Sequence, residues 1–498
     1  MTAPPTALAV PTELAGAAAR GLSQALGGRP LVIAERFTSA ARTAYTGPAA
    51  IEAARPVLAI GCYRPWQAAL PLAVVAAETR TGIRGEHERH TWPEQVDRTA
   101  RRVLAGLDKP VIAAWYATNR LIGWAGPGGQ VAAIDVVLRR QLEDKAFFAH
   151  LLAEAGVPAA LRIPSVRVET RLPSLADLQR SVGTQRLVVQ CGADSGGRGT
   201  VFVHDENDLD HASRMRGPYR VSAFVAGWSS NTTVLTVPDG NGSVSVYVDR
   251  PSHKAVGVPE AGIGPGKSAG NMWNRPWPRA AAEALVDAAV RVGRWAWHTH
   301  RMAGLFGLDA MLTPDGRVQL NEINCRNQGT TEVSAVNQQL RGLPPFLLAH
   351  LTVLLDGRVD WLPDSEAFNA ATVESAVNPT PGPFYLKIRN RYPHPVVLND
   401  SLPGSGLYSV RAGHLLHLGE GSHPAQANAD AGQVLLANLP VPGVVCPPGA
   451  EIGTAEGIAT ATGGPFSGPH DLSPYGQFVL DALDHHLITL DRPEATSR

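Results

Sequence analysis

Residues 304–326, GLFGLDAMLTPDGRVQLNEINCR, constrain the fold more than any other stretch of this chain of 498 residues. Two largely apolar segments flank a short turn formed by Pro314, Asp315 and Gly316. Turn-forming residues between two apolar segments are the pattern of a β-hairpin. The stretch therefore predicts two adjacent antiparallel strands, and any polar side chain on them has to be accommodated among apolar neighbours.

Three oxygen-bearing side chains occupy this hairpin: Asp309 on the first strand, and Glu322 and Asn324 on the second. Glu322 and Asn324 are two residues apart, so they lie on the same face of their strand. Such oxygens are the ligands that Mg²⁺ prefers, with waters and substrate phosphates completing its shell. The alternative is an acidic face in solvent. We expect the metal site, because carboxylates in apolar surroundings are normally paired or metal-bound. The apolar neighbours are Leu305, Phe306, Leu308, Leu320 and Ile323.

A second hairpin is predicted at residues 186–203, RLVVQCGADSGGRGTVFV, where a strand leads into a glycine-rich loop and another strand follows. Glycines accept positive φ and have no Cβ, so successive N–H groups of such a loop can converge on an anion such as phosphate. A surface turn is the alternative, and a glycine-rich loop alone does not decide between them. The glycines concerned are Gly192, Gly196, Gly197 and Gly199.

The chain around these hairpins divides into three segments that differ in sequence pattern. Residues 1–139 alternate short apolar segments with helical patterns, which predicts an α/β domain with a parallel sheet. Residues 140–365 contain both hairpins, and residues 366–498 are rich in Pro and Gly with short strand-like segments, which predicts a separate β-rich domain. The strands of the first domain are expected at 31–34, 57–60 and 111–116.

Composition narrows the class of partner. Lys plus Arg and Asp plus Glu both number 44, so no net charge favours nucleic acid or an anionic membrane. The most apolar run, residues 67–77, is shorter than the ~20 residues that cross a bilayer. The 4 cysteines are widely spaced and form no metal or disulfide pattern. We expect a cytoplasmic protein that binds small molecules, without nucleic-acid or membrane partners.

Together the two hairpins resemble the ATP-grasp superfamily, whose members hold ATP between two α+β subdomains and join a carboxylate to an amine. The resemblance covers about residues 140–350. Its most specific element is GLDAM followed by NEINCR, because Glu322 comes thirteen residues after Asp309, as in the metal hairpin of that family. The resemblance implies an ATP-grasp fold preceded by an α/β pre-ATP-grasp domain and followed by a β-rich C-terminal domain.

The resemblance also implies roles for single residues, with ATP and Mg²⁺ as cofactors. Asp309, Glu322 and Asn324 would hold one or two Mg²⁺ ions between the β- and γ-phosphates. Arg326 matches an arginine that faces the transferred phosphoryl group. Lys145 matches the first ATP lysine, which contacts phosphate as a point charge; an exposed lysine on the polar side of a helix is its alternative.

Further nucleotide contacts are implied at the glycine loop and at the strand VSAFVAGW, residues 221–228. The loop would close over the triphosphate as a lid, and the strand would offer backbone groups to adenine. The loop contacts are Ser195, Gly196, Gly197 and Gly199; the hinge contacts are Ala223 and Val225, with Ser229, Ser230 or Asn231 near the ribose. Arg250, Lys254, Asn271 and Asn274 are candidates for a substrate or phosphate site, with ordinary loop structure as the alternative.

The sequence departs from the family pattern in three places. Gln190 stands where most members carry a second ATP lysine, and it can donate a hydrogen bond to adenine or phosphate without neutralising charge. Ser222 replaces a frequent hinge glutamate, and Gly307 stands where the D-alanine ligase branch has an arginine. These differences argue against the D-alanine ligase and biotin carboxylase branches. The residues NEINCRNQGTT and the β-rich C-terminal region are similar to the branch that contains the peptide ligase of pheganomycin biosynthesis.

Three functions follow as hypotheses. The first is a ligase that joins the carboxylate of an amino acid, or a similar compound, to the amine of an amino acid or peptide through an acyl phosphate, in natural-product biosynthesis. The second is a small-molecule kinase of the same fold, and the third is a non-catalytic nucleotide-binding scaffold. A homodimer is compatible with each. The set of Asp309, Glu322, Asn324 and Arg326 favours catalysis over a scaffold.

Overall fold

The structure is a computed structural model. It describes residues 10–34, 55–64, 72–85, 92–192, 197, 199–379, 381–411 and 413–490. Two of the expected nucleotide contacts, Ser195 and Gly196, lie outside the described residues.

The amino-terminal part is built around a parallel sheet with the strand order β3-β2-β1-β4-β5. The parallel α/β pattern expected from the sequence is confirmed. All the residues of β1, β2 and β4 are buried, which explains their continuous apolar sequences. The strands are β1 (Leu31–Ala34), β2 (Leu58–Gly61), β3 (Ala73–Ala76), β4 (Val111–Ala113) and β5 (Gln130–Ala132); the helices are α1 (Thr12–Leu26), α3 (Ala77–Thr81), α4 (Glu94–Leu104) and α5 (Asn119–Ala125).

A small antiparallel sheet of four strands, ordered β6-β9-β7-β8, follows. Its apolar face is covered by two amphipathic helices that bury a common core. The opposite face carries Gln190, Arg220 and Ser222 and is turned toward the rest of the chain. The strands are β6 (Ser165–Val168), β7 (Leu187–Cys191), β8 (Thr200–Val203) and β9 (Tyr219–Ala223), the covering helices are α8 (Leu175–Val182) and α9 (Glu206–Ser213), and the preceding helices are α6 (Val136–Leu142) and α7 (Phe148–Glu154).

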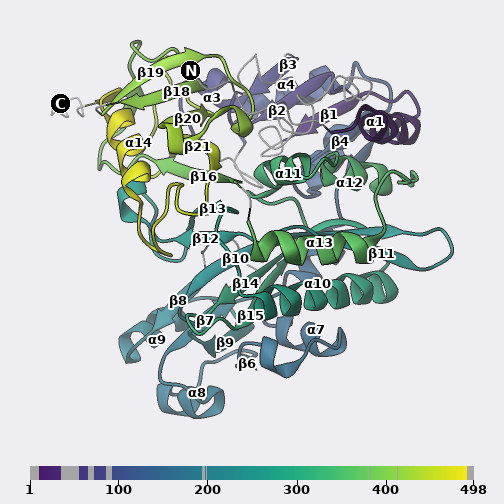
Figure 1. The fold of residues 1–498 in the computed structure, drawn as a ribbon, viewed down its shortest axis with the longest axis vertical. Helices are drawn as coiled ribbons and strands as arrows, with labels where there is room; N and C mark the ends of the chain where they lie inside the picture. Colours follow the sequence, from purple (N-terminus) through teal and green to yellow (C-terminus); the bar gives the residue numbers. More distant parts are fainter. Residues whose placement is uncertain are drawn as a thin grey trace.

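A large sheet of 11 strands runs through the remaining chain in the order β15-β14-β10-β12-β13-β16-β21-β20-β18-β19, with β11 paired to β10. Figure 1 shows α10 and α13 side by side against its lower part. The strands are β10 (Trp228–Pro238), β11 (Val244–Val248), β12 (His253–Val256), β13 (Ser268–Met272), β14 (Gly304–Leu312), β15 (Val318–Asn324), β16 (Gly382–Arg389), β18 (Gly406–Arg411), β19 (His414–Gly419), β20 (Gln433–Ala437) and β21 (Glu451–Ala459). The helices are α10 (Arg279–His300), α11 (Thr331–Leu340), α12 (Phe346–Leu354), α13 (Ser365–Val377) and α14 (Pro474–Asp484), and β17 (Val396–Leu398) pairs with β22 (Leu487–Thr489).

The carboxy-terminal strands extend the large sheet. β13 pairs with β16 through Gly270 opposite Leu386 and Asn271 opposite Tyr385, so strands from before and after residue 365 share one hydrogen-bonded sheet. This continuity brings side chains of the last third of the chain close to those of the predicted metal hairpin. The boundaries of the three domains expected from the sequence stay a prediction.

Helix α11 lies between the amino-terminal sheet and the lower strands of the large sheet (Figure 1). Residues 331–339 of this helix are all buried, although many of them are polar. Ser334, Asn337 and Gln338 donate hydrogen bonds to the carboxylate of Asp249, and Arg341 lies 3.7 Å from the same carboxylate. The buried Asp249 is thus fully partnered, as burial of a charge requires.

Candidate active site

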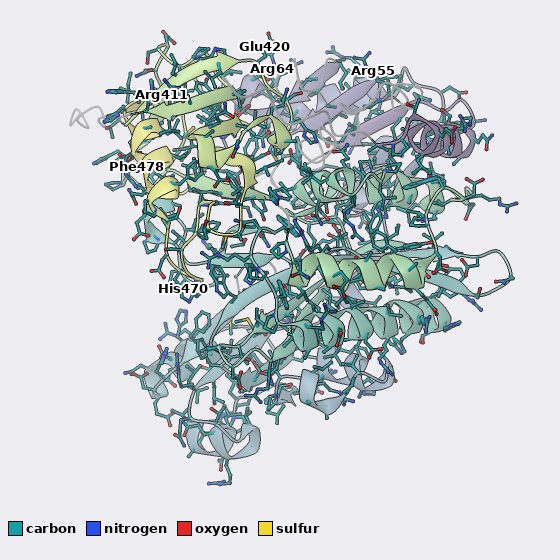
Figure 2. The ribbon with its side chains drawn as sticks, viewed as in Figure 1. Arg55, Arg64, Arg411, Glu420, His470 and Phe478 are labelled. Atoms are coloured by element: carbon teal, nitrogen blue, oxygen red, sulfur yellow. The ribbon has the colours of Figure 1, made fainter. Side chains whose placement is uncertain are left out.

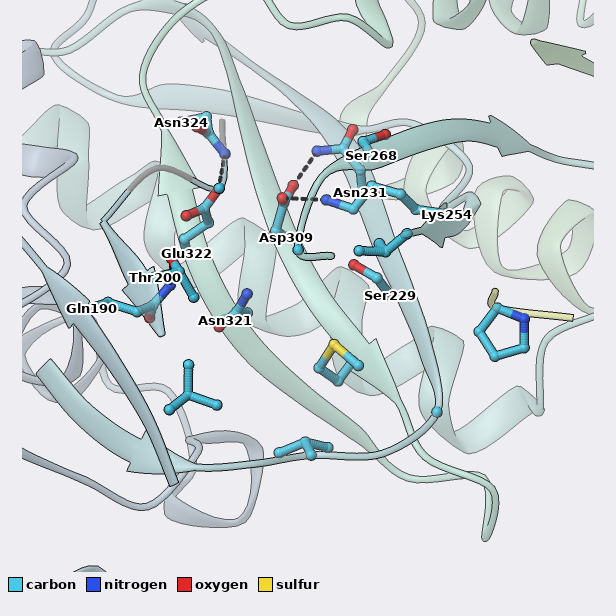
Figure 3. Close-up of a pocket in the computed structure, with 18 of the residues that line it drawn as sticks. Gln190, Thr200, Ser229, Asn231, Lys254, Ser268, Asp309, Asn321, Glu322 and Asn324 are labelled. Carbon is cyan, nitrogen blue, oxygen red and sulfur yellow. Dashed lines mark hydrogen bonds and ion pairs between the residues drawn. The ribbon is translucent and has the colours of Figure 1, made fainter. Parts of the chain in front are cut away.

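A pocket of about 550 Å³ lies between the small sheet and the large sheet. We call its two sides the small-sheet wall and the large-sheet wall. Figure 3 shows Gln190 and Thr200 on one wall, with Asn231, Lys254 and Asp309 on the other. The small-sheet wall comprises Val188, Gln190, Thr200, Ser222 and residues 223–227, and the large-sheet wall comprises Asn231, Lys254, Asp309, Glu322 and Asn324.

The predicted hairpin forms as β14 and β15, and Asp309 lies opposite Glu322 in its register. A register irregularity follows directly after Asp309. Asp309 and Asn324 are buried, Glu322 is half-buried, and all three side chains line the pocket. The structure therefore brings together the three oxygen-bearing groups that the sequence placed on one hairpin.

Each carboxylate of the large-sheet wall has an ammonium partner. The Nζ of Lys254 lies 2.5 Å from an Oδ of Asp309, and the Nζ of Lys145 lies 3.4 Å from an Oε of Glu322. Burial raises the pKa of Glu322, but the charges of Lys145 and Lys254 outweigh this effect, so the pKa ends below its usual range. Burial, only partly opposed by Lys254, raises the pKa of Asp309. The wall thus holds an ionised Glu322 beside a carboxyl whose negative charge depends on a nearby cation.

Amide groups orient these carboxylates. The Nδ2 of Asn231 donates to Asp309 at 2.5 Å and to Gln328 at 2.7 Å, and Thr330 donates to the Oδ1 of Asn231. Asn231 therefore lies at the carboxylate end of the pocket, with its amide engaged by protein groups. Its expected contact with a ribose stays a prediction.

Asn324 and Arg326 continue the polar network. The Nδ2 of Asn324 donates to Glu322 at 3.2 Å, and a guanidinium nitrogen of Arg326 donates to the Oδ1 of Asn324 at 2.6 Å. The Nε of Arg326 lies 3.1 Å from Glu143. Arg326 lines the pocket, so its guanidinium is fixed beside the predicted metal ligands.

Lys145 reaches the pocket from a loop. The stretch around it was expected to be helical, but the structure places Lys145 between α6, which ends at Leu142, and α7, which begins at Phe148. Its side chain is only 12% exposed and lines the pocket. The alternative of a solvent-exposed lysine on a helix is therefore wrong. The break in the helix turns Lys145 toward Glu322.

The hinge and the described part of the glycine loop border the same pocket. Ala223 and Val225 line it, as does Gly197. Gly197 and Gly199 have φ of +78° and +67°, values that glycine adopts without strain. A Cβ at Gly197 would lie 2.9 Å from the carbonyl oxygen of Gly266, so the close approach of these two loops requires glycine.

Of the four further candidates, two line the pocket and two do not. Lys254 and Asn271 line it, whereas Arg250 and Asn274 are buried elsewhere. Asn274 is bonded to the carbonyls of Thr460 and Gly463. Burial lowers the pKa of Arg250 to about 10.

Sequence reasoning missed the part of the pocket formed by the carboxy-terminal third. Tyr385 and Lys387 of β16 line it, and the Tyr385 hydroxyl donates to Asn271 at 2.8 Å. His470 also lines it, from a loop fastened to β12 by the bond from the Val256 N–H to Pro469 (Figure 2). In the sequence, the alternating pattern of β16 indicates only that Tyr385 and Lys387 lie on a strand, and it does not place them in a site. Their place in the site follows from the pairing of β13 with β16.

The donors of the hairpin fit Mg²⁺. Among the described residues, no group of three or more His, Cys, Asp and Glu side chains is arranged to hold a metal. The set here is two carboxylates and one amide, all with hard oxygens, and such a set leaves ligand positions for phosphates and water. Asp309, Glu322 and Asn324 are thus the residues that would hold the ion. Within the part of the chain that the structure describes, no helix has the length and apolar character needed to cross a bilayer.

Comparison with known proteins gives a match in structure alone. No family model and no curated protein match the sequence. Among solved structures, the chain is similar to the biotin carboxylase domain dimer of the Hydrogenobacter thermophilus 2-oxoglutarate carboxylase (TM-score 0.53, 14% identity, 86% of each chain). It is also similar to an L-amino acid ligase from Bacillus licheniformis (TM-score 0.50, 14% identity, 93% of this chain and 99% of that one).

The chain has the ATP-grasp fold. A third similar structure with this fold is the N5-carboxyaminoimidazole synthase of Aspergillus clavatus, solved in complex with ADP and 5-aminoimidazole ribonucleotide (TM-score 0.50, 13% identity, 86% of this chain and 94% of that one). The fold class expected from the sequence is confirmed. Although the residues argued against the biotin carboxylase branch, the ATP-grasp fold is shared with a biotin carboxylase domain, and identities this low show the fold alone.

Proposed function

We propose that the protein is an ATP- and Mg²⁺-dependent ligase that joins a carboxylate to an amine. The observation that carries the proposal is the large-sheet wall, where two carboxylates and an amide face a pocket beside Lys145, Lys254 and Arg326. This arrangement suits a magnesium nucleotide whose terminal phosphate is transferred. The three similar structures, which include an L-amino acid ligase and a complex with ADP, support the same class.

The chemical problem is that a carboxylate has no good leaving group. Phosphoryl transfer solves it: a carboxylate oxygen forms a bond to the γ-phosphorus while the bond from that phosphorus to ADP breaks. An amine then attacks the acyl carbon, phosphate leaves with the bonding electrons, and the amine loses a proton. Mg²⁺ bound at the hairpin would offset the charge of the terminal phosphates.

The residues of this chain serve that reaction in distinct ways. Asp309, Glu322 and Asn324 hold the ion, and Arg326 donates to the phosphoryl group being transferred. The nucleotide base lies at Ala223 and Val225, where the backbone is the contact. The carboxylate substrate occupies the far end of the pocket, because Lys254 and Lys387 supply positive charge there.

We further propose that the substrates are an amino acid or amino-acid-like carboxylate and the amine of an amino acid or peptide. Two features support this choice. The β-rich carboxy-terminal part contributes Tyr385, Lys387 and His470 to the pocket, and the sequence NEINCRNQGTT is similar to the pheganomycin-type peptide ligase branch. The product would be a peptide of natural-product biosynthesis.

The test is a reaction of the protein with Mg-ATP and pools of amino acids. A ligase releases ADP and forms a product lighter by one water than the sum of two substrates. A phosphorylated substrate without condensation would replace the proposal by a kinase. Nucleotide binding without ADP release from any pool would replace it by a scaffold.

A further inference from the structure

The small-sheet wall has a neutral residue where an anion is expected to bind. Gln190 of β7 lines the pocket and, among the described residues, donates a long hydrogen bond of 3.4 Å to Thr200. Directly opposite it in the register of β7 and β9 lies Arg220. Residues opposite each other on paired strands project from the same face of a sheet. A guanidinium group therefore stands next to the neutral amide, on the pocket side of the small sheet.

Arg220 is a buried cation with few partners. It is 3% exposed, and one of its terminal nitrogens donates to the backbone carbonyl of Asn321 at 2.5 Å and to the Oδ1 of that residue at 3.5 Å. Among the described residues its Nε has no hydrogen-bond partner, and its guanidinium carbon lies 5.5 Å from the centroid of the Phe148 ring. Burial lowers the pKa of Arg220 to about 10, although the charge of Glu322 partly opposes this effect, so the group stays charged at neutral pH. A buried charge costs free energy unless charges of the opposite sign compensate it.

The position of Arg220 points to that compensating charge. Its bond to Asn321 attaches it to β15, one residue before Glu322, and Asn321 lines the main pocket. On its other side lies a second hollow of about 440 Å³, lined in part by Phe147, His150 and Arg220. Arg220 thus lies on the same face of the small sheet as Gln190, lining the second hollow rather than the main pocket.

Lys145, Lys254, Arg326 and Lys387 are the Lys and Arg side chains among the described residues that line the main pocket, and three of them are paired with carboxylates. Lys145 and Lys254 are each matched to a carboxylate, and Arg326 lies against Glu143. The three pairs do not neutralise a bound magnesium nucleotide, which remains anionic. Because the protein interior has a lower dielectric constant than water, the electrostatic interaction between two charges is stronger there.

We infer that Arg220 is a positioning residue of the nucleotide site: it holds β15 at Asn321 and supplies, from the strand position beside Gln190, the positive charge that Gln190 does not bring. The inference rests on the proposed use of a magnesium nucleotide. It concerns binding of the phosphates and predicts no direct contact between Arg220 and the reacting atoms.

The experiment compares four variants by their affinity for Mg-AMP-PNP, measured by calorimetry, and by KM for ATP against kcat. Arg220→Met weakens nucleotide binding roughly tenfold or more. Arg220→Lys retains most of the affinity. In the Arg220→Met background, Gln190→Lys restores binding, because it returns a cation to the neighbouring strand position. A residue that only packs would not be rescued by a charge at another position.

The matched control is Arg167→Met. Arg167 lies opposite Arg220 on the other side, in β6, but its side chain is exposed and paired with Glu169. This variant is expected to bind the nucleotide like the wild type. The wild type and Arg220→Met should differ in nucleotide affinity at high salt as well. Salt should reduce this difference less than it would if the charge were exposed.

The outcomes separate the two claims. If the wild type binds no magnesium nucleotide, the proposed function fails. If the wild type binds and a folded Arg220→Met binds equally well, only the inference on Arg220 is wrong. Should Arg220→Met not fold alone, the double variant Gln190→Lys/Arg220→Met decides: folded protein with near-native affinity supports the inference, and folded protein without affinity overturns it.

Discussion

The two walls of the pocket differ in how they carry charge. On the large-sheet wall, each carboxylate faces an ammonium, and amide side chains fix both. On the small-sheet wall, the lining side chains are neutral, and the cation Arg220 lies beside Gln190 without lining the pocket itself. We conclude that one wall depends on individual side chains, whereas the other depends on its backbone and on a charge at longer range. Single substitutions should therefore have unequal effects on the two walls.

The largest effect is expected on the large-sheet wall. Glu322→Gln removes a negative charge that the proposed ion needs, so kcat/KM should fall by a factor on the order of a thousand. The rate of ADP release at substrate concentrations well below KM measures this loss. Glu366→Gln, an exposed change on α13, is the control and should keep the wild-type rate. A Glu322→Gln protein with half the wild-type rate would contradict the role of the hairpin.

A second effect concerns stability of the same wall. Lys254→Met leaves the buried Asp309 carboxyl without its ammonium, so the free energy of unfolding should fall by about 3 kcal/mol without nucleotide. Urea denaturation measures it. In Arg291→Met, loss of the exposed pair with Asp287 should change the same quantity far less, because solvent screens that pair. Equal losses in the two variants would show that the Lys254 pair is no more important than a surface pair.

A third, smaller effect concerns His350, whose imidazole holds the backbone of β14 in the large sheet. The Nδ1 of His350 accepts the N–H of Leu305 at 2.9 Å, and burial lowers the pKa of His350 to about 3. In the unfolded chain the imidazole of His350 binds a proton near pH 6.5. The stability that the neutral His350 contributes is therefore present above that pH and is lost as the pH falls toward 3. From pH 7 to 5 the loss should be about 2 kcal/mol.

Comparison with His350→Asn measures the contribution of this single group. The variant should show a weaker dependence of its unfolding free energy on pH between 5 and 7 than the wild type does. Parallel curves for the two proteins would mean that His350 is protonated in the folded state, contrary to its burial.

The smallest effect is expected on the small-sheet wall. Val225→Ala trims a side chain at the hinge but leaves the backbone that would contact adenine, so KM for ATP should change by less than about threefold. Steady-state kinetics with varied ATP measure it. A tenfold rise in KM would show that this wall also depends on its side chains and would remove the distinction between the two walls.

Several elements could be predicted from the sequence because the patterns that indicate them involve neighbouring residues. The turn at residues 314–316 and the apolar flanks predicted β14 and β15, and continuous apolar segments predicted the buried strands of the parallel sheet. A helical stripe of apolar residues marks α7, but it gives no sign of the break between α6 and α7 where Lys145 lies. That break decides where the lysine points.

The sequence alone determined the hairpin and its oxygen donors, because strand alternation and turn chemistry act between neighbouring residues. Which cations meet those donors depends on the packing of distant segments: Lys254 comes from β12 to Asp309, and Lys145 comes from the loop between α6 and α7 to Glu322. Arg220 of the small sheet reaches β15 at the carbonyl of Asn321. These partners are distant along the chain. They become neighbours through strand pairing and sheet packing, whose register no local pattern specifies.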